Sequence, residues 1–253
     1  MIMENTYRIA DRNIQIRSSW NMVHRMCRDY LTSEKPDFCV QVDPLDIEKE
    51  CEESDKTAIQ ESRPIRPWTD AYLETLAVYR RIAEKMPDYD TVLFHGSAIA
   101  VDGQGYLFTA PSGTGKSTHA GMWRELLGSR AVMINDDKPL LRITESGVIV
   151  YGTPWNGKHR LGSNVSAPLR AVCSLERAEE NSIEEISVWE AVPVLLRQCY
   201  RPSEPAALQK TLLLLDRMTK TVQFFRLRCN TDPEAARISW QAMRPADCEA
   251  EAY

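Results

Sequence analysis

Residues 110–118, with the sequence APSGTGKST, combine residue types that bind phosphate when they stand between a strand and a helix. The two glycines allow the backbone to curl so that several N–H groups point into one concavity, and the following helix adds its positive N-terminal end. Lys116 supplies a charge for the β- and γ-phosphates of a nucleotide, and the Ser117 hydroxyl can bind Mg²⁺. Alanine replaces the first glycine of the strict pattern, a mild departure where the backbone stays extended. The predicted nucleotide-binding residues are Ser112, Gly113, Thr114, Gly115, Lys116, Ser117 and Thr118.

An acidic pair, Asp136-Asp137, follows the apolar run at residues 131–135, which is expected to be a strand. In an α/β sheet, the carboxyl end of such a strand faces the same crevice as the loop after the neighbouring strand. One carboxylate can hold Mg²⁺, and the other can take the proton of an attacking hydroxyl. We therefore interpret Asp136 as the metal-side carboxylate and Asp137 as the candidate base.

A histidine, His95, lies within the apolar run at residues 92–101, which predicts a single strand. A hairpin through Gly103 and Gly105 can bring it beside the phosphates. However, a histidine in an apolar strand is more often a buried structural residue than a ligand. Spacing alone therefore leaves the role of His95 open.

A glycine-flanked loop at residues 152–162 carries three consecutive basic or imidazole side chains: Lys158, His159 and Arg160. Such a loop can contact the γ-phosphate or the acceptor, and Lys158 or Arg160 can neutralise the charge that develops during transfer. The alternative is a surface loop with solvated cations. Nothing in the sequence ranks the three side chains.

The elements that position these residues fall into two predicted regions. Residues 1–87 predict a small N-terminal α+β module, with β-like runs at 7–16 and 38–42 and an acidic segment at 43–61 that fits a helix or a loop. A connecting helix then begins at Thr69 or Asp70 and ends before Pro87. Its recurring apolar face consists of Tyr72, Leu76, Tyr79, Ala83 and Met86.

Residues 88–253 predict an α/β domain, because strand-like and helix-like segments are interleaved. The expected strands after the first are at residues 106–110, 131–135, 140–144, 148–151, 171–175 and 222–227. The expected helices are at residues 116–127, 188–200 and 206–218, with a last one after Asp232.

Composition narrows the class of protein. Among 253 residues the formal net charge is −5, which argues against a chain that coats nucleic acid or anionic lipid. No apolar run approaches the ~20 residues needed to cross a bilayer, and the N-terminus lacks the apolar stretch of a secretion signal. Seven cysteines without a C-x-x-C spacing indicate neither a disulfide framework nor a zinc site. We therefore expect a cytoplasmic protein without nucleic-acid or membrane partners.

Four short motifs in a fixed order resemble the HPr kinase/phosphorylase family and the structurally related phosphoenolpyruvate carboxykinases: HGSA at 95–98, DG at 102–103, SGTGKST at 112–118 and DD at 136–137. The resemblance covers roughly residues 91–153, and it implies a P-loop domain of that kind with a mixed sheet. It also implies that His95 lies in the active site, near the metal or the transferred phosphate.

The same resemblance bears on the acceptor. Carboxykinases are considerably longer chains with extra arginines for a dicarboxylate, which favours a kinase. The glycine-rich signature with which HPr kinases engage their protein substrate is not recognisable, which makes HPr a doubtful acceptor. Short homologues of this kind also resemble kinases that phosphorylate a serine of a small peptide.

Together these features predict a kinase that uses ATP and Mg²⁺ to phosphorylate a hydroxyl, with a serine of a protein or peptide as the favoured acceptor. The predicted catalytic residues are Asp137, Asp136, His95 and Lys116, and Ser117 with Asp136 would hold the metal. Two alternatives stay open: a nucleotide-dependent switch or scaffold with residues 1–66 as its interaction module, and a small-molecule kinase. Homo-oligomers are frequent in the resembled kinases, but no residue pattern here indicates one.

Overall fold

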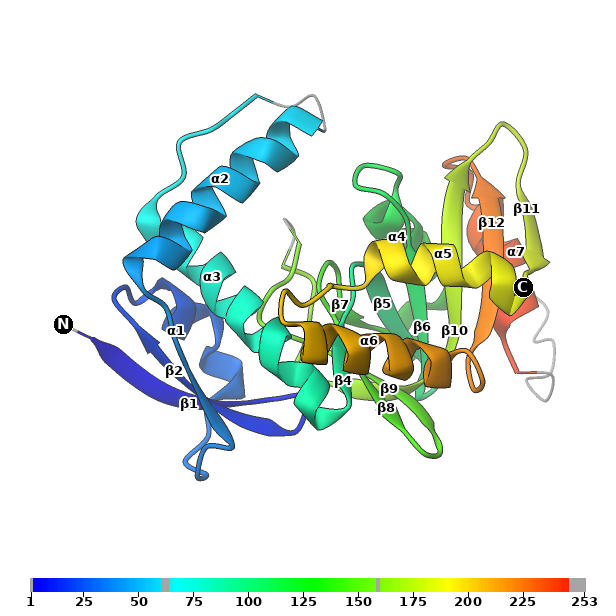
Figure 1. The fold of residues 1–253 in the computed structure, drawn as a ribbon. Helices are drawn as coiled ribbons and strands as arrows, with labels where there is room; N and C mark the ends of the chain where they lie inside the picture. Colours follow the sequence, from blue (N-terminus) through cyan, green and yellow to red (C-terminus); the bar gives the residue numbers. More distant parts are fainter. Residues whose placement is uncertain (1, 61–63, 158–159, 246–253) are drawn as a thin grey trace.

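The computed structural model describes residues 2–60, 64–157 and 160–245. Its N-terminal part contains a three-stranded sheet in the order β1-β2-β3, in which β1 and β2 are antiparallel and β3 is parallel to β2 (Figure 1). The strands are β1 (Met3–Ile9), β2 (Arg12–Ser18) and β3 (Phe38–Gln41), and the helices are α1 (Met22–Met26), the short 3₁₀ helix η1 (Arg28–Tyr30), α2 (Pro44–Gln60) and α3 (Asp70–Lys85).

Two predictions for this part need correction or completion. The run at residues 7–16 is a hairpin rather than one strand, because Ala10 and Asp11 adopt positive φ angles of 48° and 57° and turn the chain back. The acidic segment is helical, as α2. Helix α3 begins as predicted, with the Thr69 side chain accepting a hydrogen bond from Tyr72 N. Its buried face is rotated from the predicted one: Tyr72, Leu76 and Tyr79 are only half-buried, and the buried apolar residues are Leu73, Ala77, Val78, Ile82 and Ala83.

The remainder forms a nine-stranded mixed sheet in the order β4-β8-β9-β10-β6-β5-β7, with β12 paired to β10 and β11 to β12. Strand β10 is parallel to β6 and β12, and all the other pairs are antiparallel. The bounds are β4 (Thr91–Leu93), β5 (Ser97–Val101), β6 (Gln104–Thr109), β7 (Ala131–Asn135), β8 (Leu140–Thr144), β9 (Gly147–Tyr151), β10 (Ser166–Arg177), β11 (Ser182–Glu185) and β12 (Gln223–Cys229).

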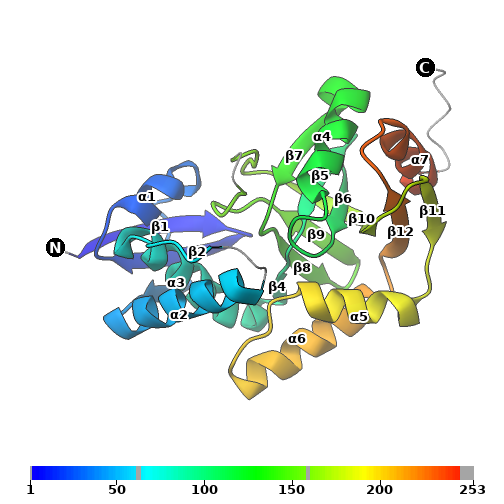
Figure 2. The same cartoon turned by 90° about the horizontal axis from the view of Figure 1, so that it is seen from above.

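Helices cover both faces of this curled sheet (Figure 2). On one face, Trp123 and Trp240 pack with Tyr106 and Phe108 of β6, and on the other, Leu195 and Leu214 pack with Leu107. Alternate residues of β6 therefore enter opposite cores, as the pleat requires. The helices are α4 (Lys116–Leu127) and α7 (Glu234–Met243) on the first face and α5 (Val188–Gln198) and α6 (Pro205–Met218) on the second; the 3₁₀ helices η2 (Met86–Tyr89) and η3 (Gly128–Arg130) are short connections.

The predicted strand at residues 92–101 is wrong as a single element. It is broken at Phe94-His95-Gly96, so that β4 pairs with β8 while β5 pairs with β6 and β7. A Cβ atom on Gly96 would come within 2.8 Å of the Phe108 carbonyl oxygen, so the chain passes here at a distance that only glycine permits. The break is invisible to hydropathy, because the residues on both sides of it are buried.

The two sheets share an apolar cluster. It contains Ile14 and Ile16 of the small sheet, Val78 of α3, and Leu140 and Trp155 of the larger region. The division of the chain at residue 87 stays a prediction, since this packing runs continuously across it. Among the residues that the structure describes, no helix combines the length and apolar character that a membrane span requires.

Candidate phosphoryl-transfer site

The loop between β6 and α4 has the conformation that its glycines predict. Gly113 and Gly115 have φ angles of 79° and 124°, and α4 begins immediately after Gly115. A Cβ atom at either glycine would meet nothing within 4 Å, so the backbone torsion itself, rather than crowding, requires glycine at both positions. The first turn of α4, whose N–H groups have no acceptor within the helix itself, therefore adjoins a tightly curled loop, which is the arrangement that binds phosphate.

Two basic side chains hold this loop from its carbonyl side. The Lys116 ammonium donates hydrogen bonds to the carbonyl oxygens of Ala110, at 2.9 Å, and Pro111, at 3.3 Å. The Arg177 guanidinium donates to the carbonyl oxygens of Gly113, at 2.5 Å, and Thr114, at 3.4 Å. Because C=O and N–H point in opposite directions across a trans peptide, anchoring the Thr114 carbonyl turns the Gly115 N–H away from Arg177.

The strand order explains how distant residues meet at this loop. Strands β6 and β7 flank β5 and run antiparallel to it, so their carboxyl ends and the start of β5 lie at one edge of the sheet. Strands β10 and β12 run parallel to β6 and end at the same edge. The phosphate-binding loop, the acidic pair, Ser97 and Arg177 therefore converge, although they come from four different strands.

Asp136 is buried, with 4% of its surface exposed. Its Oδ1 atom accepts a hydrogen bond of 2.8 Å from the Ser97 hydroxyl, while its Oδ2 atom is buried with no hydrogen-bond partner among the described residues. A Cβ atom on Gly157 would stand 3.4 Å from Oδ2, so glycine keeps the space in front of this oxygen open. An unpaired buried carboxylate oxygen is energetically costly, and a bound cation is a common reason for its presence.

The turn that presents the acidic pair is fixed by Asn135. The Asn135 Oδ1 atom accepts hydrogen bonds from the backbone N–H groups of Asp137, at 2.9 Å, and Lys138, at 2.7 Å. Its Nδ2 group donates to the carbonyl and hydroxyl oxygens of Thr153, at 3.2 and 3.0 Å. Asn135 thereby holds the acidic pair against the segment that leads into loop 152–162.

His95 lies in the break between β4 and β5 and is held by Gln198. Its backbone N–H donates to the Gln198 carbonyl at 2.9 Å, and its Nδ1 donates to Gln198 Oε1, also at 2.9 Å. Its Nε2 is 3.6 Å from Asp137 Oδ1. Burial, followed by the positive charges of Lys138 and Lys116, lowers the pKa of His95 to about 4, and the charge of Asp137 offsets only part of this. The imidazole is therefore neutral near pH 7, with its proton on Nδ1.

A cavity of about 380 Å³ opens beside the phosphate-binding loop. Thr118 and Met122 of α4 form one wall, and the ends of β10 and β12 form the other. Its lining combines apolar surface with hydrogen-bonding groups, which is the usual character of a small-molecule site. The residues that line it are Gly113, Thr114, Gly115, Thr118, His119, Met122, Leu175, Arg177, Ala178, Cys229, Asn230 and Thr231.

Comparison with known proteins gives little further guidance. No family model matches the chain, and no curated protein matches it. Among solved structures, the HPr(Ser) kinase/phosphatase from Coxiella burnetii is 15% identical over 51% of this chain and 97% of that one, with a TM-score of 0.29. A similarity at that TM-score supports no conclusion about the fold or the function of this chain. The molecule itself is an α/β protein with a curled mixed sheet.

The structure brings most of the predicted residues to one edge of the sheet. Asp136, Asp137 and His95 are neighbours, and the charge of Lys116 is close enough to act on His95. Among the predicted nucleotide-binding residues, the side chains of Ser112, Ser117 and Thr118 are exposed, and that of Lys116 is buried. His95 precedes β5 instead of lying within a strand, because the chain breaks there to pair with Gln198 and Cys199.

The predicted acceptor loop is only partly described. Lys158 and His159 lie outside the described residues. Arg160 is exposed, has a φ angle of 50°, and donates its backbone N–H to the Gly157 carbonyl at 3.0 Å. The close approach of Gly157 to the Asp136 carboxylate places this loop beside the acidic pair. A role for Lys158, His159 and Arg160 in binding the substrate stays a prediction.

Sequence reasoning missed four residues that shape the site: Ser97, Asn135, Arg177 and Gln198. Ser97 lies within the motif quoted at 95–98 and Asn135 directly precedes the acidic pair, so their positions in the sequence were a usable signal. Arg177 and Gln198 come from distant segments that carry no motif. Only the pairing of β10 with β6, and of residues 198–200 with residues 93–95, brings them into contact with the site.

Proposed function

We propose that this protein is a kinase that uses ATP and Mg²⁺ to phosphorylate a hydroxyl, with a serine of a peptide or protein as its acceptor. The observation that carries the proposal is the convergence of the curled loop at Gly113–Gly115 with the buried Asp136, whose Oδ2 atom has no hydrogen-bond partner among the described residues. A loop that binds phosphate beside an unpaired carboxylate oxygen is suited to a nucleotide polyphosphate and the cation that accompanies it.

The nucleotide would place its phosphates at the loop and at the first turn of α4. Lys116 would exchange its hydrogen bonds to the Ala110 and Pro111 carbonyls for the β- and γ-phosphates, which lie within reach of a flexible ammonium. The cavity beside Thr118 and Met122 would take the nucleoside, because it begins at the same glycines that bind the phosphates. With the nucleoside in the cavity and the phosphates at the loop, the terminal phosphate would point toward Asp136 and His95.

The donor set fits Mg²⁺. The hydroxyl of Ser117 and the free Oδ2 of Asp136 would hold the ion, and water and phosphate oxygens would complete its shell. No group of three or more His, Cys, Asp or Glu side chains within residues 2–60, 64–157 and 160–245 could hold a metal ion by itself. Such a sparse protein contribution is usual for Mg²⁺ at nucleotide sites. When bound, the ion neutralises the charge of the phosphates during transfer.

The acceptor hydroxyl would lie between Asp137 and His95. The carboxylate oxygen Oδ1 and the unprotonated Nε2 are both hydrogen-bond acceptors and stand 3.6 Å apart, so a shared hydroxyl proton would satisfy both. Lys138 forms an ion pair of 3.4 Å with the same Oδ1 and would orient the Asp137 carboxylate. Asp137 would accept the proton as the acceptor oxygen attacks, and His95 would orient the hydroxyl.

The experiment is transfer of radiolabel from γ-labelled ATP to serine peptide pools and to a cell lysate, with Mg²⁺ or with chelator. We expect labelling that requires the metal, and a loss of about 100-fold in the Asp137→Asn variant, which keeps its nucleotide affinity. Glu125→Gln is the matched control, because Glu125 is an exposed carboxylate on α4 and is not one of the residues proposed to act in the site. ATP hydrolysis with no labelled acceptor in any pool or lysate would contradict the proposal.

A further inference from the structure

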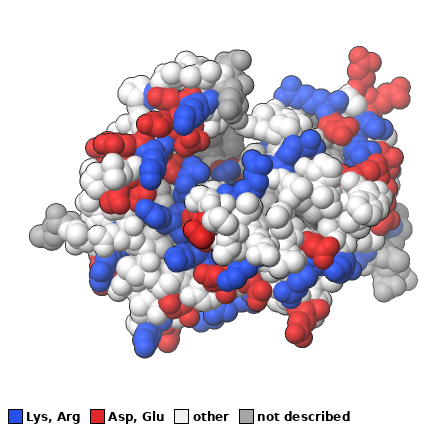
Figure 3. All heavy atoms as spheres, in the orientation of Figure 1, with Lys and Arg blue, Asp and Glu red and all other residues white. Residues whose placement is uncertain are grey.

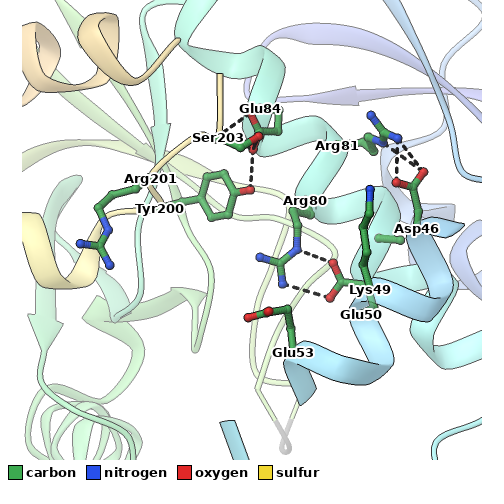
Figure 4. A pocket seen from close by; sticks show the side chains of 11 residues that line it. Asp46, Lys49, Glu50, Glu53, Arg80, Arg81, Glu84, Tyr200, Arg201 and Ser203 are labelled. Carbon is green, nitrogen blue, oxygen red and sulfur yellow. Dashed lines mark hydrogen bonds and ion pairs between the residues drawn. The ribbon is translucent and has the colours of Figure 1, made fainter. Parts of the chain in front are cut away.

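A second cavity, of about 440 Å³, lies between the N-terminal helices and the segment that follows α5. Asp46, Lys49, Glu50 and Glu53 of α2 line one side, residues 77–84 of α3 form the floor, and Tyr200, Arg201 and Ser203 line the other side (Figure 4). In the space-filling view the surface is hollowed between α2 and the rest of the chain, and Lys and Arg side chains gather around the hollow (Figure 3). Nothing in the proposed transfer chemistry uses this cavity.

Most of the charged groups in the cavity are paired with one another. Arg80 donates to both carboxylate oxygens of Glu50, and Arg81 forms an ion pair of 2.7 Å with Asp46. Glu84 accepts hydrogen bonds from the Tyr200 hydroxyl, at 2.8 Å, and from Ser203 N, at 2.9 Å. These contacts join the three walls and fix the shape of the cavity.

Two cationic side chains of the lining form no ion pair with a described residue. Lys49 and Arg201 are exposed, and within the described residues neither side chain has a hydrogen bond or an ion pair. They lie on opposite sides of the cavity, with the paired Arg80 between them (Figure 4). A ligand that enters the cavity therefore meets two cations without an ion-pair partner, whereas the carboxylates of Glu50, Asp46 and Glu53 are paired with Arg80, Arg81 and Lys56. The remaining carboxylate, Glu84, has only the neutral donors of Tyr200 and Ser203, so cations still outnumber carboxylates among the groups without an ion pair. This arrangement selects a negatively charged group.

The cavity adjoins the transfer site through two segments. Gln198, which holds His95, is three residues before Arg201, and the intervening Tyr200 donates its N–H to the Leu93 carbonyl at 2.8 Å. On the other side, Tyr79 precedes Arg80 on α3. Burial and then the negative charge of Asp137 raise the pKa of Tyr79, and the charge of Glu50 acts in the same direction. The charge of Asp137 in the transfer site and that of Glu50 in the cavity lining therefore both act on Tyr79.

We infer that this cavity docks the acceptor peptide, and that Lys49 and Arg201 bind an acidic side chain close in sequence to the serine that is phosphorylated. The inference rests on the proposed kinase function. His95 and Asp137 are not among the residues that line the cavity, so a ligand that occupies both places must be extended. A peptide segment meets that requirement, whereas a small hydroxy acid occupies only one of the two places.

The test measures peptide binding separately from transfer. Fluorescein-labelled serine peptide pools, one with Asp and Glu at the flanking positions and one with Asn and Gln in their place, are titrated with the full chain and followed by anisotropy. We expect the acidic pool to bind about tenfold more tightly than the neutral pool. The double variant Lys49→Glu/Arg201→Glu should lose this preference. The pair Arg25→Glu/Lys35→Glu, at exposed positions outside the cavity, makes the same change in net charge and should keep the preference.

Other outcomes separate this inference from the kinase proposal. Equal binding of the two pools, or equal loss in both double variants, overturns the docking site even if ATP-dependent labelling of serine is observed. Complete competition by millimolar succinate, with no contribution from the rest of the peptide, overturns the peptide as ligand. Selective binding of the acidic pool by a chain that ATP and Mg²⁺ do not stabilise would support the docking site and remove the kinase proposal.

Discussion

The most informative perturbation is the substitution Asp136→Asn, because it should stabilise the metal-free protein while removing its response to Mg²⁺. The carboxylate is buried, Ser97 satisfies one of its oxygens, and the other has no hydrogen-bond partner among the described residues. An unsatisfied buried polar group costs about 1–3 kcal/mol, and more when it is charged. Replacing the charged oxygen by a neutral amide should therefore raise the free energy of unfolding by about 1 kcal/mol, or about 2–4 °C in Tm for a chain of this size.

The assay is thermal unfolding with and without ATP and Mg²⁺. For the wild-type chain, ligand at 100 times its Kd adds about 2.7 kcal/mol to the unfolding free energy. The Asp136→Asn variant should keep only the part of this gain that ATP gives without metal. Ser97→Ala should act in the opposite direction in the metal-free protein, lowering stability by about 1–2 kcal/mol, because it leaves the remaining carboxylate oxygen unpaired as well.

A particular pair of results would refute the reasoning. If metal-free Asp136→Asn melts below the wild-type chain and still gains stability from Mg²⁺ in the presence of ATP, then Asp136 is a satisfied structural residue and the ion binds elsewhere. Glu125→Gln serves as the control, since it removes the same charge from an exposed position of α4 and should shift neither melting temperature.

Three further predictions concern stability and nucleotide affinity. Burial lowers the pKa of both His95 and His119 to about 4, so the unfolded chain binds protons first as the pH falls. The contribution of these histidines to the free energy of unfolding should be full above about pH 6.5 and decrease toward pH 4. His119→Gln should reduce this decrease, measured by urea unfolding, by at most about 3 kcal/mol. An unchanged slope would contradict the buried neutral state of His119. Arg177→Met, which frees the loop carbonyls, should weaken ATP binding about threefold to tenfold by calorimetry, and a Kd equal to that of the wild type would show that the guanidinium does not order the loop. Gly113→Ala should weaken ATP binding about tenfold through its positive φ, and undiminished affinity would mean that the loop binds nucleotide in another conformation.

Local elements were predicted well from the sequence. The bounds of α4 and β7 agree with the prediction, because their ends are set by Gly128 and by the change from apolar to acidic residues at Asp136. The hairpin of β8 and β9 was likewise confirmed. The ends of these elements are set by residues that are close together in the sequence, so the sequence alone is enough to predict them.

Other elements could not be predicted because their limits are imposed by distant partners. Strand β10 spans Ser166–Arg177, and so begins five residues before the predicted 171–175 and ends two residues after it, since β9, β6 and β12 all pair with it. Strand β11 was not predicted, because its residues Ser182–Glu185 are largely exposed and gain their hydrogen bonds only by pairing with β12. The division of residues 91–101 into β4 and β5 follows from the competing pairings with β8 and β6.

For the candidate site, the sequence by itself determined which groups are present and how the loop curls, because positive φ at Gly113 and Gly115 is a local property of glycine. Tertiary structure decided the state of those groups. The unpaired Oδ2 of Asp136, the neutral imidazole of His95 and the anchoring of the loop by Arg177 arise from burial and from contacts between segments 39 to 103 residues apart. Burial and hydrogen bonding of these groups depend on residues that become neighbours only when the chain folds. The spacing of residues along the sequence therefore does not predict them.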